Sequence, residues 1–409
     1  MSDRSLARRT KSKVIFDGAD ISKDLEQYLL SITYEDHDED DADTLEIRVQ
    51  DRDEVWSSKW LNAMWEAGKG MSIQAVISAC NWNSNGGDAV LDCGAFELDS
   101  VSMQGPPSTI AIRGTSAPYN CTLQQTQHSK SWESYDLKKI AGEIASNAGM
   151  AVQYLPKPVP SYARVEQYRC SDIMFLKKLC QDAGFSVKVC NKIIVIFDQK
   201  EYETKGPVRT FSKSSGKIIK YKLYTNETQT YALCHVYYDN DGTLIEWTQK
   251  AEDYDPKNNS NQKLEIQQKV STVEEAKALA KEMLRLYNKF AFEAEFTVPG
   301  DPALVAGATF AVSGFGKFDG TYLIKTATHK ASGGSSGYTT TVKGQKALSS
   351  EQSDNSSSSS EMSQEQIDQL ATEVIRGDWG AGQERKDKMA AAGYDYQTVQ
   401  DRVNELIYG

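Results

Sequence analysis

Alternating hydrophobic and polar positions dominate most of the chain. Residues 44–50 place Leu45, Ile47 and Val49 on one face, and residues 291–298 repeat this period of two, which is the pattern of a half-buried β-strand. Asp17-Gly18 predicts a hairpin turn within residues 14–21. The same signals predict further strands at 71–79, 89–99, 108–114, 185–190, 192–198, 230–238, 243–248, 304–313, 321–329 and 337–344.

Three segments instead carry apolar residues at helical spacing, namely residues 134–148, 171–183 and 273–290. The first is expected to begin at Ser134 or at Tyr135-Asp136, and Ser171 is the expected N-cap of the second. Gly149 and Gly184 are expected to end these two helices. The expected buried stripe of the third helix comprises Val273, Ala276, Ala280, Leu284, Tyr287 and Phe290.

One domain boundary stands out by composition. Residues 349–363 read SSEQSDNSSSSSEMS, and such a polar run cannot bury enough apolar surface to fold. We therefore expect a flexible serine-rich tether between a large body and a small module. The expected organisation is a basic N-terminal arm at 1–13, a first β-barrel at 14–118, an α+β insert at 119–205, a second β-barrel at 206–347, a linker at 348–363 and a three-helix module at 364–409.

Composition narrows the class of protein. The 409 residues carry 46 Lys and Arg against 57 Asp and Glu, a formal net charge of −11, which argues against a nucleic-acid binder. No apolar run is long enough to predict a transmembrane helix, and the basic first residues lack the apolar segment of a signal peptide. The 7 cysteines form no CxxC pair and the 4 histidines offer no zinc spacing, so we expect reduced thiols, a cytoplasmic origin and no metal site.

Motifs of catalysis are missing from the sequence. It contains no HExxH, GxSxG, Walker A or dinucleotide-binding signature. We therefore predict a non-enzymatic protein that needs no cofactor. A hydrolytic centre built without a local motif stays an alternative.

Two charged segments each allow more than one interpretation. The acidic run Glu35–Asp43 fails as an EF-hand loop because Asp41 stands at the required glycine and Ile47 at the required glutamate. A solvated loop between two strands is expected there, and an accidental cation site is the alternative. The N-terminal cations at Arg4, Arg8, Arg9, Lys11 and Lys13 are interpreted either as a disordered arm or as an arm that docks on an acidic neighbour.

The body resembles the late control protein D family, the baseplate hub of contractile phage tails, over roughly residues 12–346. The resemblance rests first on Trp132, on Gln167 and on a D-x-x-F-L-x-x-L helix formed by Asp172, Phe175, Leu176 and Leu179. It rests also on a second segment near the end of the body. This segment contains an F-D-G-x-Y run at Phe318, Asp319, Gly320 and Tyr322, a G-Y-T-T run at 337–340, and the single residues Gly307 and His329.

The resemblance implies two tail-tube-like antiparallel β-barrels per chain with an α+β insert between them. Hubs of this family are homotrimers, so six barrels would form a ring that joins a sixfold tail tube to a threefold central spike. The implied partners are therefore two further copies of the chain, the tube protein, the spike protein and baseplate wedge proteins. His329, in a closing strand, is expected to be structural rather than catalytic.

The C-terminal segment is similar to the peptidoglycan-binding repeat of a pneumococcal phage lysozyme and of many endolysins. The quoted pattern includes E-V-I at 373–375, G-x-W-G-x-G at 377–382, E-R at 384–385, A-G-Y-D-Y at 392–396 and V-Q at 399–400. It departs from the pattern at Asp378, Ala381 and Met389. The resemblance implies a three-helix bundle that binds the muramyl dipeptide part of peptidoglycan.

Helical spacing in this segment fits that fold. Ile367, Leu370 and Val374, with Ala371 beside them, face inward from the first helix, and Val399, Val403 and Leu406 from the third. So small a module has little core, so Trp379 and Tyr394 are interpreted either as core residues or as sugar-stacking aromatics. Arg385 is interpreted either as a ligand contact through charge-assisted hydrogen bonds or as a bracing arginine. The candidate peptidoglycan-binding residues are Trp379, Glu384, Arg385, Tyr394, Asp395 and Gln400.

Together these observations predict a structural baseplate hub that carries a cell-wall anchor. It would belong to a contractile phage tail or to a tailocin, a headless tail-like bacteriocin, assembled in the cytoplasm of the host bacterium. Two alternatives stay open: a tail-associated peptidoglycan hydrolase, and a surface-binding protein whose body is a passive spacer.

Overall fold

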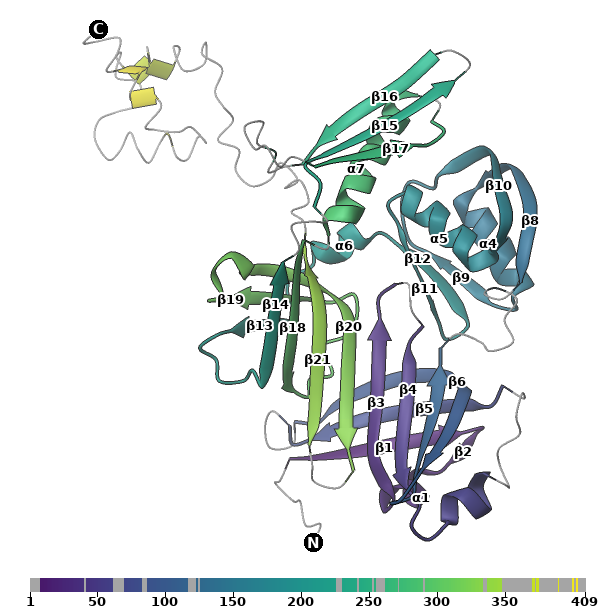
Figure 1. Ribbon diagram of the computed structural model, residues 1–409. Coiled ribbons are helices and arrows are strands. Elements are labelled where there is room, and N and C mark those ends of the chain that lie inside the picture. The colour runs from purple at the N-terminus through teal and green to yellow at the C-terminus, as the bar shows by residue number, and fades with distance from the viewer. Residues whose placement is uncertain are drawn as a thin grey trace. The chain divides into compact units, whose positions relative to one another are not determined.

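The computed structural model describes residues 8–39, 42–61, 70–82, 87–116, 123, 126–225, 230–240, 243–251, 254, 262–270, 272–289, 291–333 and 337–347, and nine positions of the C-terminal segment. The chain divides into two compact units, residues 1–348 and residues 349–409. Figure 1 shows the elements of the first unit. Among the described residues, no helix is both long and apolar enough to span a membrane.

A 13-stranded sheet forms the framework of the first unit. Its hydrogen-bonded order is β14-β18-β21-β20-β3-β4-β7-β6-β5-β1-β2, and β19 pairs with both β20 and β13. The pairings are antiparallel apart from β13 with β19. The strands are β1 Arg9–Phe16, β2 Ala19–Asp20, β3 Leu29–His37, β4 Thr44–Gln50, β5 Ser72–Cys80, β6 Ala89–Gln104, β7 Thr109–Thr115, β13 Arg209–Ser212, β14 Lys220–Thr225, β18 Phe292–Pro299, β19 Thr309–Ser313, β20 Gly320–Ser332 and β21 Tyr338–Lys346.

The predicted alternation decides which side chains enter the core. In β4, Leu45, Ile47 and Val49 are buried as expected. Ala294 and Phe296 are buried in β18, where the intervening glutamates face outward. The predicted hairpin at Asp17-Gly18 is confirmed, since β1 pairs with β2 across it. These strands serve two hydrophobic cores, one under β1–β7 and one under β13, β14 and β18–β21.

The two parts of the sheet meet where β3 pairs with β20. Tyr34 is opposite His329 in this register, and the two rings stack with their centroids 6.1 Å apart. His329 is fully buried, and its Nε2 lies 2.9 Å from the Leu304 carbonyl oxygen. That nitrogen must therefore donate, so Nδ1 accepts from the Tyr338 hydroxyl at 2.7 Å. His329 is a structural histidine, as expected from the sequence.

Residues 127–197 form a section with a hydrophobic core of its own. Asp136 and Ser171 cap its two helices by accepting from the backbone amides of Lys139 and Met174. Gly149 and Gly184 follow the helices with φ of 67° and 77°, a conformation that favours glycine. Its elements are β8 Gln127–Asp136, α4 Leu137–Asn147, β9 Ala151–Tyr154, β10 Ser161–Ser171, α5 Asp172–Asp182, β11 Ser186–Cys190 and β12 Ile193–Phe197.

A second section, made of three strands and one helix, interrupts the expected second barrel. The strands β15 Leu233–Asn240, β16 Thr243–Lys250 and β17 Lys263–Gln267 pair only with one another among the described residues, and helix α7 Val273–Asn288 packs on them. Residues 206–347 are therefore not one β-barrel. The expected stripe of α7 is also partly wrong: Val273 and Tyr287 are 46% and 41% exposed because the helix covers one face of a narrow sheet.

The prediction of a disordered N-terminal arm is wrong for the second half of that segment. Arg9–Lys13 belong to β1, which pairs with β5 from Arg9 to Phe16. Residues 1–7 lie outside the described part of the chain. The remaining elements of the first unit are α1 Ser22–Glu26, α6 Gln199–Glu203, the π-helix η1 Val55–Leu61 and the 3-10 helix η3 Gly316–Phe318.

In the second unit, all nine described positions are helical. Six of them form one apolar cluster, namely Leu370, Ala371, Val374, Met389, Val399 and Val403. The inward orientation predicted for residues 370, 371, 374, 399 and 403 is thereby confirmed. Ile367, Leu406 and the serine-rich linker lie outside the described residues.

Candidate functional sites

Three carboxylates of the acidic run are buried rather than solvated, which overturns the sequence expectation for them. Asp36, Asp38 and Asp43 are 6%, 3% and 5% exposed. They belong to a group that we call the junction cluster. Its members come from both parts of the main sheet, from the section 127–197 and from the end of helix α7. The junction cluster comprises Asp36, Asp38, Glu39, Asp43, Lys188, Lys289 and Lys325.

Lys188 ties the section 127–197 to the first part of the main sheet. Its Nζ donates to Asp36 Oδ1 at 2.7 Å and lies 3.1 Å from Asp43 Oδ1. Asp36 Oδ2 in turn accepts from the backbone amide of Ala306 at 2.8 Å. Burial lowers the pKa of Lys188, but the two carboxylates outweigh it and raise the pKa overall.

Lys325 and Lys289 form the other half of the junction cluster. Lys325 is the residue at the irregularity in β20, and its Nζ lies 2.9 Å from Asp38 Oδ2 and contacts Glu39. Lys289, just after α7, reaches Glu39 Oε1 at 2.6 Å. Gln199 of α6 donates to Asp38 Oδ2 at 3.1 Å. The acidic residues thus contact five other stretches of chain, at Lys188, Gln199, Lys289, Ala306 and Lys325.

Neighbouring carboxylates in the cluster have opposite pKa shifts. Burial raises the pKa of Asp38 to about 6 against the opposing effect of Lys325. Burial also acts on Glu39, but Lys325 and Lys289 outweigh it and bring its pKa well below the usual range. Asp38 Oδ1 has no hydrogen-bond partner among the described residues. Glu39 is therefore the firmly ionised member, and Asp38 is the carboxylate that burial disfavours.

Each carboxylate of the cluster lies beside at least one of its lysines. Among the residues that the structure describes, no group of three or more His, Cys, Asp or Glu side chains could hold a metal ion. Three lysines occupy the positions that a cation would take beside these carboxylates. The ion pairs of the cluster join the sections of the first unit.

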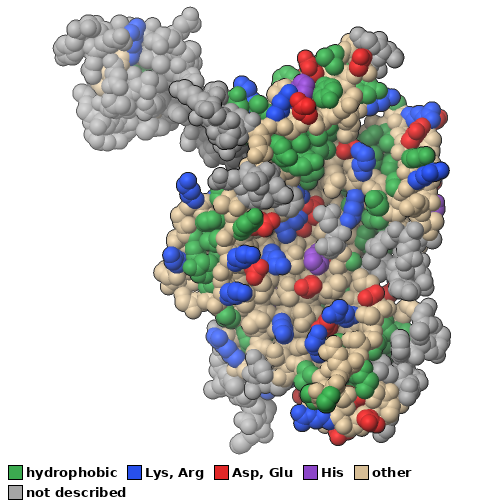
Figure 2. Space-filling view, viewed as in Figure 1, with side chains coloured by type: hydrophobic (Ala, Val, Ile, Leu, Met, Phe, Trp, Pro, Cys, Tyr) green, Lys and Arg blue, Asp and Glu red, His purple; other side chains and the backbone are tan. Residues whose placement is uncertain are grey.

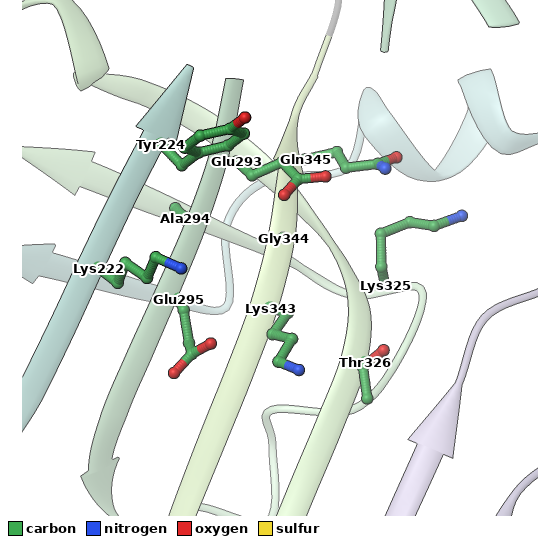
Figure 3. A pocket seen from close by; sticks show the side chains of 10 residues that line it. All are labelled: Lys222, Tyr224, Glu293, Ala294, Glu295, Lys325, Thr326, Lys343, Gly344 and Gln345. Atoms are coloured by element: carbon green, nitrogen blue, oxygen red, sulfur yellow. The ribbon is translucent and has the colours of Figure 1, made fainter. Parts of the chain in front are cut away.

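A shallow hollow of about 320 Å³ lies on the outer face of the second part of the main sheet. Lys222, Glu295 and Lys343 follow one another across β14, β18 and β21 in register. Tyr224, Glu293 and Gln345 form the next row, and Figure 3 shows both rows lying over the strands. In Figure 2 basic and acidic side chains are interspersed on this face. The hollow has no catalytic grouping, but it offers charged side chains to a partner.

The predicted peptidoglycan-binding residues lie almost entirely outside the described part of the chain. This holds for Trp379, Glu384, Arg385, Tyr394 and Asp395. Gln400 is described, is helical and is half-buried beside Val399 of the module core. Sequence reasoning missed the three lysines of the junction cluster, and no local signal marks them, because they stand more than 100 residues from the acidic run.

Solved phage tail proteins share this fold. The tail protein from Neisseria meningitidis MC58 superposes with a TM-score of 0.63 at 13% sequence identity, covering 82% of this chain and 96% of that chain. Similarity at this identity shows the fold alone. The first unit therefore has a mostly β-sheet fold that matches the fold of that tail protein.

Sequence comparison identifies the family. The model of the phage tail baseplate hub (GPD) family matches residues 115–335, more than half of the chain. The chain belongs to that family. A probable baseplate hub protein of Escherichia phage 186 is 27% identical over 175 residues, which is 42% of this chain and 40% of that protein.

The C-terminal segment matches a different family. The CW_7 repeat model matches residues 368–407. The lysozyme of Streptococcus phage Cp-7 is 65% identical over 37 residues, or 9% of this chain and 11% of that protein. The chain thus spans less than two thirds of the length of these curated relatives. Both resemblances stated from the sequence are confirmed.

Proposed function

We propose that the protein is the structural baseplate hub of a contractile phage tail or of a tailocin, and that it carries its own cell-wall anchor. The observation that carries the proposal is the joining of a hub-family body and a CW_7 repeat in one chain. The body supplies a rigid frame, because the junction cluster ties its sections together. The particle would be assembled in the cytoplasm of the host bacterium.

The finer architecture is part of the proposal. Each of the two parts of the main sheet curves over its own core, which supports two tail-tube-like units joined through β3 and β20. The section 127–197 would be the α+β insert between them. A homotrimer would then present six such units to the tail tube and three-fold symmetry to the central spike, with wedge proteins at its outside.

The C-terminal module would be a three-helix bundle that binds the muramyl dipeptide part of peptidoglycan. We propose Trp379, Glu384, Arg385, Tyr394, Asp395 and Gln400 as its binding residues. Arg385 would make charge-assisted hydrogen bonds to the lactyl-peptide carbonyls or to a carboxylate. Three modules on one trimer would bind a repeating polymer together, and such multivalency raises the apparent affinity by roughly 100-fold or more.

Sedimentation with purified peptidoglycan tests the anchor directly. The intact chain should co-sediment with the insoluble wall, and Arg385→Ala should reduce the bound fraction. Arg402→Ala is the matched control, since Arg402 is a helical arginine of the same module outside the proposed set. The anchor proposal fails if the intact chain stays in the supernatant, and the assignment of Arg385 fails if both variants bind alike.

The similarity to a lysozyme raises a second candidate function, that of a tail-associated peptidoglycan hydrolase. That match lies within the C-terminal repeat and covers 11% of the lysozyme, so it supports a shared wall-binding repeat and gives no support to a hydrolytic centre in this chain. A zymogram on peptidoglycan separates the two functions. We expect no cleared zone, and clearing by the intact chain would favour the hydrolase.

A further inference from the structure

Two loops rich in lysine, serine and glycine follow the paired strands β13 and β19. These strands are parallel neighbours, and Ser212 is opposite Ser313 at their carboxyl ends (Figure 1). The loops read SKSSGK over residues 212–217 and SGFGK over residues 313–317. They lie against each other, since the backbone amide of Lys213 donates to the Ser313 carbonyl oxygen at 3.1 Å.

Lys346 reaches the second loop from strand β21. Its Nζ donates to the Lys317 carbonyl oxygen at 3.1 Å and lies 5.0 Å from the centroid of the Phe292 ring. The side chain has room because position 320 is a glycine: a Cβ at Gly320 would lie 2.8 Å from Lys346 Cε. We call the two loops, together with Lys346, the lysine loops.

The cations of the lysine loops have no carboxylate partner. Four lysines form no ion pair with a described residue, namely Lys213, Lys217, Lys317 and Lys346. The lysines of the junction cluster, in contrast, each lie beside a carboxylate. Unpaired cations in one small region repel one another, so an anion from outside the chain would stabilise the lysine loops.

The backbone of the lysine loops also favours an anion. Gly216 and Gly316 have φ of 63° and 68°, and successive amides in such turns form concave anion sites. The loop after β19 shows this property directly, because the amides of Gly314 and Phe315 donate to the Asp319 carboxylate at 3.1 and 2.7 Å. The lysines stand around this turn and remain available to a second anion.

A phosphate group fits these donors better than a single carboxylate does. It has at least three acceptor oxygens and up to about two negative charges at neutral pH, so several lysines can bind it together. Two of these lysines are already positioned. Lys213 Nζ lies 5.9 Å from the centroid of the Phe315 ring, and Lys346 is held by the contacts given above. Positioned donors lose less freedom when an ion binds.

We propose that the lysine loops bind a phosphate group, as the free ion or as part of a phosphate-bearing polymer. The ammonium groups hold the phosphate oxygens, and the exposed loops leave space for a polymer to continue on either side. The site uses side chains and turns rather than the open edge of a strand. It goes beyond the hub function proposed above and does not depend on it.

Titration calorimetry of the intact chain tests the site. Sodium phosphate and long-chain polyphosphate are titrated separately at constant ionic strength, because the phosphate group could come from either source. We expect both to bind, and the polymer more tightly, because it offers several phosphate groups to the four lysines. Binding of polyphosphate alone would support the site and assign the phosphate to a polymer.

Neutralisation of two lysines supplies the decisive comparison. Lys213→Gln with Lys317→Gln should weaken polyphosphate binding about tenfold. Lys213→Arg with Lys317→Arg keeps both charges and should retain binding. The matched control is Lys11→Gln with Lys13→Gln, which removes two exposed lysines of β1 that form no ion pair with a described residue. It should leave the affinity unchanged.

Four results would overturn the proposal. The first is no binding of either probe at millimolar concentration. The second is an equal loss of affinity in both glutamine variants, which would mean diffuse attraction by surface charge. The third is a polyglutamate peptide that binds as tightly as polyphosphate, because the ligand would then be an acidic protein segment. The fourth is a changed number of associated chains in Lys213→Gln with Lys317→Gln, because the lysine loops would then be a contact between copies.

Discussion

The ammonium group of Lys325 lies 2.9 Å from the Asp38 carboxylate and joins strand β20 to the loop that follows β3. The same ammonium contacts Glu39, which Lys289 reaches from the end of α7. One short acidic loop thus binds the second part of the sheet and a helical section to the first part. The stability of the first unit should depend on this loop.

Asp38 and Glu39 should respond to neutralisation in opposite directions. The folded-state pKa of Asp38 lies above its unfolded value, so its ionisation costs stability as the pH rises through about 6. Asp38→Asn should therefore stabilise the protein by roughly 1 kcal/mol at pH 7.5. Glu39→Gln should destabilise it by about 3 kcal/mol, because Lys289 and Lys325 both lose the carboxylate of Glu39.

Thermal unfolding of both variants at pH 7.5 and pH 5 checks this pair of expectations. The gain from Asp38→Asn should shrink at pH 5, where Asp38 of the parent chain is protonated in the folded state. Equal losses of stability in both variants would show that the two carboxylates are equivalent.

Lys188 should be essential for docking the section 127–197. Lys188→Met leaves Asp36 and Asp43 buried without their cation, and removal of one partner from such a site costs about 3–5 kcal/mol. Lys192→Met is the matched control on the same hairpin, because Lys192 is 69% exposed and lies 3.9 Å from Glu97. Unfolding midpoints and limited proteolysis measure the effect. A Lys188→Met protein as stable as the control would refute the role of the ion pair.

His329 should make the body sensitive to acid. Burial lowers the pKa of His329 to about 4, below the unfolded value of 6.5. The unfolded chain then takes up the proton first, so stability falls as the pH drops from 6.5 towards 4, by about 3 kcal/mol in all.

Denaturant unfolding between pH 8 and pH 4 measures that loss. His329→Gln should be less stable at pH 8 but should lose less on acidification. His128→Gln, at a half-exposed position, should keep the full pH dependence of the parent chain. An unchanged slope in His329→Gln would assign the acid sensitivity to other groups.

Two glycines should differ sharply in their tolerance of alanine. A Cβ at Gly300 would lie 2.0 Å from the Tyr338 ring, and Tyr338 is the residue that donates to His329. Gly300→Ala should therefore lower the unfolding midpoint. Gly142, inside α4, has no atom within 4 Å of the added Cβ, so Gly142→Ala should stabilise by up to about 1 kcal/mol. Melting curves of the two variants would contradict this account if both shifted the same way.

Local patterns predicted the local elements. Alternation in residues 44–50 and 291–298 identified β4 and β18, and Asp136 and Ser171 cap helices at the expected places. The acidic run was misjudged because its partners stand at 188, 289 and 325, which only the folded chain brings together. The span 206–347 was misjudged because strand periodicity does not reveal which strands share a sheet. The binding residues proposed for the C-terminal module come from resemblance alone, whereas the helical period predicted the inward positions of its apolar cluster.

Light scattering of the purified intact protein tests the hub assignment most directly. A hub that joins a sixfold tube to a threefold spike must associate in threes, so we expect a particle of three 45.4 kDa chains, alone or with the spike protein. The mass of a single chain under both conditions would contradict it.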